Sequence, residues 1–166
     1  MRGGLGRILV AGLLLAAAMT PARAVTTITT QFNVTATVLA NCAVSATNLV
    51  FGTYTASSPT PLTASSTVSV TCTNSLAYTV ALDGGSVAAS VAARAMSDGA
   101  THTLNYQLYT ANTYVSIWGD GTASTVTVAG TGNGAAQPLT VYGRIPASQF
   151  VTAGSYLDHV TVSVTY

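Results

Sequence analysis

Short runs of alternating apolar and polar residues follow one another along the chain, separated by turns that carry Asp-Gly pairs or clustered glycines. Alternation with a period of two is typical of a strand with one buried and one solvated face. Glycine in the turns allows the positive φ angles that tight connections need. We predict strands over residues 49–54, 65–73, 77–83, 102–109, 125–129, 137–145 and 159–166. This spacing predicts an all-β fold, specifically a β-sandwich.

Helices are not expected, because the chain contains no Lys and no Glu, and β-branched residues recur throughout. The Ala-rich segment 87–96 is short and is interpreted as a loop or a single turn. The residues predicted to form the core are Val68, Val70, Cys72, Tyr78, Val80, Leu82, Leu104, Tyr106, Leu108, Leu139, Val141, Ile145, Val160, Val162, Val164 and Tyr166.

Residues 1–24 have the features of a secretory signal peptide. Arg2 and Arg7 precede an apolar run over 8–19, and Ala22-Arg23-Ala24 is a small-x-small cleavage site. The apolar run is too short to span a bilayer of about 30 Å. We therefore expect the chain to be exported, with the mature protein starting near Val25 and forming one domain.

Charged residues are scarce in the predicted mature chain, where Arg94 and Arg144 stand against four aspartates. A nucleic-acid-binding protein needs clustered cations, so this class is excluded. We hypothesise that Arg144 pairs with Asp158. With so few charges, we expect a neutral surface that is rich in Ser and Thr. A surface of this kind gives little electrostatic protection against self-association.

Cys42 and Cys72 are the only cysteines of the chain. In an exported protein an even pair is most simply a disulfide. A redox pair or a metal site is disfavoured, because the spacing is not CxxC and no histidine lies near either cysteine.

No catalytic constellation emerges from the residue pattern, so we expect no enzyme, no cofactor and no metal. His102 and His159 lie on predicted strands and are interpreted as structural, and the sequence has no Gly-x-Ser-x-Gly elbow. The aspartates mostly precede glycine in turns, which favours a turn-forming role. Trp118, with Tyr109 and Tyr114 nearby, is interpreted as packing in the core or at its rim rather than as a platform for binding sugar.

The segment directly after the predicted leader, residues 25–38, alternates with particular regularity. One face carries Thr30 and the apolar residues Ile28, Phe32, Val34, Ala36 and Val38, and the other face is polar. A strand at the start of a mature chain is free to leave its own domain. The last predicted strand, 159–166, reaches the final residue and offers an open sheet edge.

Six stretches resemble the spore coat protein U domain family: 70–73, 78–85, 94–96, 104–109, 141–146 and the closing stretch 154–166. They follow the family order over the whole mature chain, with His159 standing where a small polar residue is expected. The resemblance implies a pilin-like subunit of an archaic chaperone–usher pilus, with an immunoglobulin-like (pilin-type) incomplete β-sandwich over 39–166 and an N-terminal donor-strand extension over 25–38. The donor-strand face is then Ile28, Phe32, Val34, Ala36 and Val38, and the edge strand that faces the chaperone is Val160, Val162, Val164 and Tyr166.

The implied partners are a periplasmic chaperone, an outer-membrane usher and neighbouring copies of the same or related subunits. The subunit is expected to cross the periplasm and to become part of a surface fibre in adhesion or biofilm formation. Two alternatives stay open on the sequence: a structural protein of a spore or cyst coat, and a sugar-binding tip adhesin.

Overall fold

The computed structural model of the protein describes residues 23–166, and this part of the chain contains eight strands and no helix. Residues 1–22, which hold nearly all of the predicted signal peptide, lie outside the described residues. In the described part no helix is long and apolar enough to cross a membrane. The strands are β1 Cys42–Ala46, β2 Leu62–Cys72, β3 Ala77–Leu82, β4 Arg94–Ser97, β5 Thr103–Tyr109, β6 Val128–Thr131, β7 Gln137–Ile145 and β8 Val162–Thr165.

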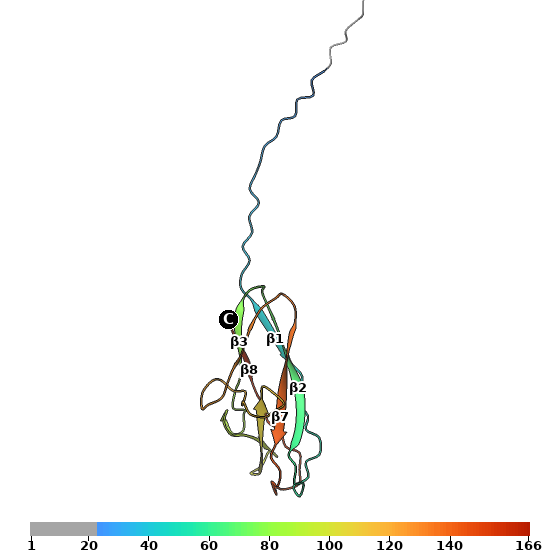
Figure 1. Ribbon diagram of the computed structural model, residues 1–166, viewed down its shortest axis with the longest axis vertical. Helices are drawn as coiled ribbons and strands as arrows, with labels where there is room; N and C mark the ends of the chain where they lie inside the picture. The colour runs from blue at the N-terminus through green and yellow to red at the C-terminus, as the bar shows by residue number, and fades with distance from the viewer. Residues whose placement is uncertain (1–22) are drawn as a thin grey trace, which may run out of the picture. The chain divides into compact units, whose positions relative to one another are not determined.

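The strands form two antiparallel sheets that face each other across the core. The larger sheet has the order β1-β2-β7-β5-β4, and the smaller one has the order β6-β3-β8. Figure 1 shows β3 and β8 on one side of the domain and β2 and β7 on the other. The predicted all-β sandwich is confirmed, and β8 is the last strand of the smaller sheet.

Most strands that combine alternation with clear turn signals were predicted at the right place, although β6 covers 128–131 instead of 125–129 and β8 covers 162–165 instead of 159–166. The predicted strand 137–145 has the same bounds as β7, and its inward residues Val141 and Ile145 are buried. Two strands were missed, because β1 is exposed along most of its length and β4 begins with a buried arginine. The strand predicted over 49–54 is wrong, since this segment has no strand pairing.

The core lies between the two sheets and contains most of the predicted residues. Leu139, Val160, Val162 and Val164 are only partly buried, although they pack against the core cluster. Tyr166 is 57% exposed, so its assignment to the core is wrong. The fully buried predicted residues are Val68, Val70, Cys72, Tyr78, Val80, Leu82, Leu104, Tyr106, Leu108, Val141 and Ile145.

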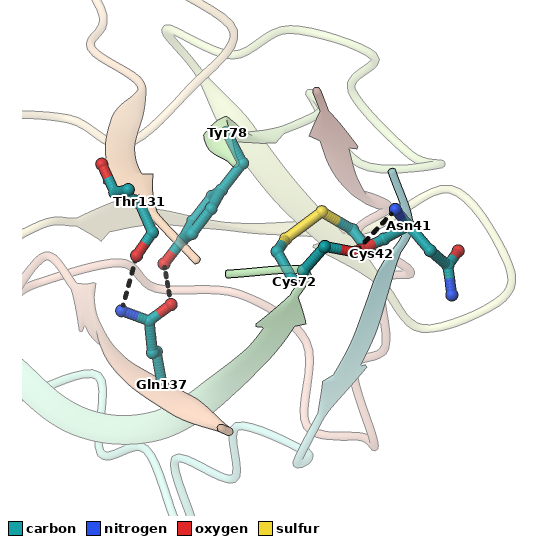
Figure 2. Close-up of a disulfide and its surroundings, with 7 residues drawn as sticks. Asn41, Cys42, Cys72, Tyr78, Thr131 and Gln137 are labelled. Atoms are coloured by element: carbon teal, nitrogen blue, oxygen red, sulfur yellow. Dashed lines mark hydrogen bonds between the residues drawn. A yellow bond between two sulfur atoms is a disulfide. The ribbon is translucent and has the colours of Figure 1, made fainter. Parts of the chain in front are cut away.

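The predicted disulfide between Cys42 and Cys72 is present and joins the first residue of β1 to the last residue of β2. The two cysteines face each other directly in the antiparallel register. Beside the disulfide, the Tyr78 hydroxyl of β3 bonds to Gln137 Oε1 of β7, and Gln137 Nε2 donates to the Thr131 carbonyl (Figure 2). The two sheets are therefore linked by a polar bridge at the same end of the domain as the disulfide.

Candidate functional site: an open groove beside the last strand

Strand β8 is an edge strand, because it pairs with β3 on one side and no described strand pairs with its other side. In the register with β3, Ala81 lies opposite Ser163 and Leu82 opposite Val162. Beyond β8, the Asp83 amide donates to the Thr161 carbonyl at 3.1 Å and the Ser86 amide to the His159 carbonyl at 3.0 Å. Hydrogen bonding alternates along an antiparallel strand. The amides and carbonyls of Val160 and Val162 therefore point away from β3, to the open side.

A groove with a cavity volume of about 1170 Å³ runs along this open side. One wall is the segment 46–56, which follows β1, and the other wall is the segment 151–160 with Val162. The floor consists of core side chains from both sheets, and each of these side chains is at most 7% exposed. The floor residues are Val68, Leu82, Leu104, Tyr106, Leu108, Val141 and Ile145.

The first wall directs alternate side chains toward the core although it is not a strand. Leu49 and Phe51 pack over Gly143 of β7, where an added Cβ would lie 2.8 Å from both side chains. Phe51 also meets Tyr106 edge to face, with 6.3 Å between the ring centroids, whereas Val50 is 74% exposed. The alternation of residues 49–51 in the sequence thus corresponds to alternation between the core and solvent. The segment 49–54 has no regular strand pairing, because it borders the groove and has no neighbouring strand there.

The predicted chaperone-facing residues lie along the second wall and β8. Val160 and Val162 line the groove, and Val164 packs against the core cluster farther along β8. All three valines are half-buried, and Tyr166 at the chain end is exposed. The structure thus brings an unpaired backbone edge and a row of apolar side chains together in one place.

Asp158 holds the second wall to the body of the domain. Its Oδ1 accepts hydrogen bonds from the amides of Ser86 at 2.8 Å and Val87 at 3.0 Å, and its Oδ2 accepts one from the Tyr106 hydroxyl at 2.7 Å. Burial first, and then the bond to Asp158, raise the pKa of the Tyr106 hydroxyl well above its ordinary value of 10.0. Tyr106 therefore stays a neutral hydrogen-bond donor beneath the groove.

The pairing predicted between Arg144 and Asp158 is wrong. Arg144 lies over the ring of Tyr114, with its Cζ 5.5 Å from the ring centroid, and Asp158 is engaged by the amides and the hydroxyl described above. Arg144 faces outward on β7, since it alternates with the buried Gly143 and Ile145. That face is separated from Asp158 by the sheet itself.

Arg94 is the structural cation that the sequence interpretation missed. Its side chain is fully buried, and its guanidinium donates to the backbone carbonyls of Asp83, Leu82 and Trp118 and to Gln107 Oε1. Burial lowers the pKa of Arg94 below its ordinary value. One signal in the sequence marked Arg94: it is a single arginine in an Ala-rich stretch of a chain that is almost without cations.

The other candidate groups have structural roles. Trp118 is 1% exposed, so it packs in the core and offers no platform for a sugar. His102 Nδ1 lies 2.7 Å from Asp98 Oδ2 on an exposed loop, and His159 lies on the second groove wall. The described residues contain no cluster of three or more His, Cys, Asp or Glu side chains that suits a metal ion.

The chain divides into two compact units with the boundary between Thr37 and Val38, so Val38 of the predicted donor-strand extension belongs to the second unit. Residues 23–41 have no regular secondary structure. The apolar side chains of the predicted donor face are exposed, Phe32 and Val34 at 84% each and Ile28 at 92%.

Residues 28–163 match the family model of the Spore Coat Protein U domain. The chain belongs to the Spore Coat Protein U domain family. No curated protein matches the chain significantly.

Among solved structures, this Spore Coat Protein U domain is similar to a chain in the crystal structure of the CsuC–CsuE chaperone–tip adhesion subunit pre-assembly complex, from the archaic chaperone–usher Csu pili of Acinetobacter baumannii. The TM-score is 0.55 at 24% sequence identity, which establishes a shared fold. The match covers 78% of this chain and 40% of the other chain, so the present protein spans less than half of that relative's length.

Proposed function

We propose that this Spore Coat Protein U domain protein is a structural subunit of a secreted chaperone–usher surface fibre and that it polymerises by donor-strand exchange. The observation that carries the proposal is the groove of about 1170 Å³ beside the unpaired edge of β8. An edge with free backbone groups next to half-buried apolar side chains is unstable alone, and an added strand satisfies both at once. The relative from the Csu pili supports the same reading at the level of fold.

The extension has the chemistry that the groove requires. Residues 25–38 carry no charge, and most residues that line the groove are apolar, with Thr, Ser, Asn, His and Asp side chains among them. Phe32, Val34 and Val38 can each contribute about 1.5 to 3 kcal/mol when they become buried. The groove and the extension are different surfaces of the same chain, so the contact between copies is heterologous. Repeating such a contact need not close into a ring and then yields a fibre.

The proposed partners are those that the family resemblance implies. A periplasmic chaperone covers the groove during transit by lending a strand to the edge formed by Val160, Val162 and Val164. At the outer-membrane usher, the extension of a neighbouring copy or a related subunit replaces it. The finished location is the cell surface, in adhesion or biofilm formation. The sugar-binding tip adhesin is not favoured, because Trp118, on which that alternative depended, is buried.

Deletion of residues 25–38 tests the exchange directly. The shortened protein is expected to accumulate as a chaperone-bound monomer in cells that carry the chaperone and usher, and to form no fibres by electron microscopy. Fibres of normal length from the shortened protein would refute donor-strand exchange through this segment.

The two faces of the extension provide a matched pair of substitutions. Phe32→Asp places a charge on the predicted inward face, and Thr35→Asp places the same charge on the outward face. We expect Phe32→Asp to abolish fibres and Thr35→Asp to leave their yield within about twofold. Equal loss in both variants would contradict the face assignment.

The acceptor edge has a matched pair as well. Val162 lines the groove, and Ser163, the next residue on β8, points to solvent. Val162→Asp is expected to abolish co-purification with the periplasmic chaperone, because a charge would be buried beside the lent strand. Ser163→Asp serves as the control and should co-purify normally.

A further inference from the structure

The hydrogen bonding between β3 and the second groove wall is no longer purely main chain to main chain beyond Leu82. At the next pair, the Asp83 amide donates to the Thr161 carbonyl at 3.1 Å, as in a regular antiparallel ladder. The return bond is different, because the Thr161 amide donates to the Asp83 carboxylate Oδ1 at 2.9 Å. A side chain thus replaces the main-chain acceptor at the point where the wall leaves the sheet.

Arg94 explains the replacement. Its Nε and Nη2 donate to the Asp83 carbonyl at 2.9 and 2.6 Å, so this carbonyl is occupied by the buried guanidinium. The carboxylate of the same residue then takes over the bond to the wall. The Gly85 amide also donates to Asp83 Oδ1 at 3.0 Å and fixes the carboxylate in place.

Three residues farther toward the N-terminus, Asp158 makes a second attachment. Besides the bonds from the Ser86 and Val87 amides, its Oδ1 accepts one from the Ser86 hydroxyl at 2.9 Å and one from the His159 amide at 2.9 Å. Its Oδ2 is fixed by the Tyr106 hydroxyl from the groove floor. The wall is therefore tied to the loop after β3 and to the floor through one carboxylate.

We propose that Asp83 and Asp158 are positioning residues that hold residues 158–161 extended before any strand enters the groove. This inference rests on the proposed function. The segment 158–161 lies outside β8, and its groove side has no partner in the described part of the chain. An acceptor edge that is already extended loses less conformational freedom when a strand docks, so docking is faster and tighter.

The test uses the chain after signal removal and a fluorescent synthetic peptide of residues 25–38 as the strand. Asp83→Ala and Asp158→Ala are expected to slow peptide association roughly tenfold and to raise hydrogen exchange of the His159 and Thr161 amides by a similar factor, the scale of one lost bond to a charged group. Asp158→Asn keeps one acceptor oxygen and should recover part of both effects. Asp120→Ala, which removes a turn carboxylate bonded to Thr122, is the control and should change neither.

The outcomes separate the two claims. Unchanged exchange of the His159 and Thr161 amides in both alanine variants would overturn the positioning role. Faster exchange with an unchanged association rate would also overturn it, since the carboxylates would then be merely structural. If the unaltered protein takes up no peptide, the proposed donor-strand function fails, and the exchange measurement alone decides whether the carboxylates hold the wall.

Discussion

The indole Nε1 of Trp118 donates a hydrogen bond of 3.1 Å to the carbonyl of Val80 in the middle of β3. The backbone of Trp118 is equally engaged, because its amide donates to the Leu108 carbonyl and its carbonyl accepts from Arg94. A segment between β5 and β6 thereby joins both sheets to the buried arginine.

Trp118→Phe is expected to lower the free energy of unfolding by about 2 to 3 kcal/mol, through the lost volume and the unsatisfied Val80 carbonyl. Urea unfolding followed by far-ultraviolet circular dichroism measures the change. Val115→Ala is the control, since Val115 is 78% exposed on the same segment and should cost under about 0.5 kcal/mol. Similar stability in the two variants would contradict the core role of the indole.

Removal of the disulfide by the double substitution Cys42→Ala and Cys72→Ala is expected to cost about 3.5 kcal/mol, the chain-entropy value for a loop of this size. The two cysteines are 30 residues apart. Urea midpoints with and without reductant provide the measurement. Reductant should shift the midpoint of the unaltered protein and leave the double variant where it is.

Gly85→Ala is expected to be strongly destabilising, because an added Cβ would lie 2.0 Å from Asp158 Oδ2 and the residue has a φ of +77°. Gly99→Ala is the matched control, with a φ of +84° and no atom within 4 Å of the added Cβ. The control therefore isolates the backbone strain, about 1 kcal/mol. Thermal unfolding should show a clearly larger loss for Gly85→Ala, and equal losses would contradict the close packing of Gly85 against Asp158.

Acid should weaken the attachment made by Asp83. Burial favours the neutral acid, but the hydrogen bonds from Thr161 and Gly85 and the charge of Arg94 outweigh it and lower the pKa of Asp83 from 3.8. A lowered pKa in the folded state stabilises the fold above pH 3.8, and this contribution is lost as the pH falls through the folded value. The stability difference between the unaltered protein and Asp83→Asn should be constant above about pH 5 and shrink below about pH 4. Urea midpoints measured from neutral to acid pH check this, and a difference independent of pH would refute it.

The sequence predicted those parts of the fold that local pattern determines. Strand β7 alternates and is flanked by turns, so its bounds were predictable, and Asp98 and Asp120 form the expected turns by accepting the Ala100 and Thr122 amides. Strand β1 was not predictable, because only its first residue is partly buried and it offers no alternation to detect.

The candidate site was only partly predictable for a related reason. The inward valines follow from alternation, but the groove exists because a neighbouring strand is missing, and pairing between strands is a long-range property. The 49–54 segment alternates like a strand and still lacks strand pairing. Arg94 and Asp158 act mainly through backbone groups distant in sequence, which residue spacing does not encode.

The position of the disulfide determines how the domain would respond to pulling. In a fibre of the proposed kind, tension enters each subunit through its extension and reaches the sandwich at Asn41, directly before Cys42. The Cys42–Cys72 bond passes this force covalently to the end of β2, which pairs with β7 in the middle of the larger sheet. The hydrogen bonds between β1 and β2 are therefore protected from being broken one residue at a time. A fibre under flow would resist extension through β2 and β7, the strands in the middle of the larger sheet of each subunit.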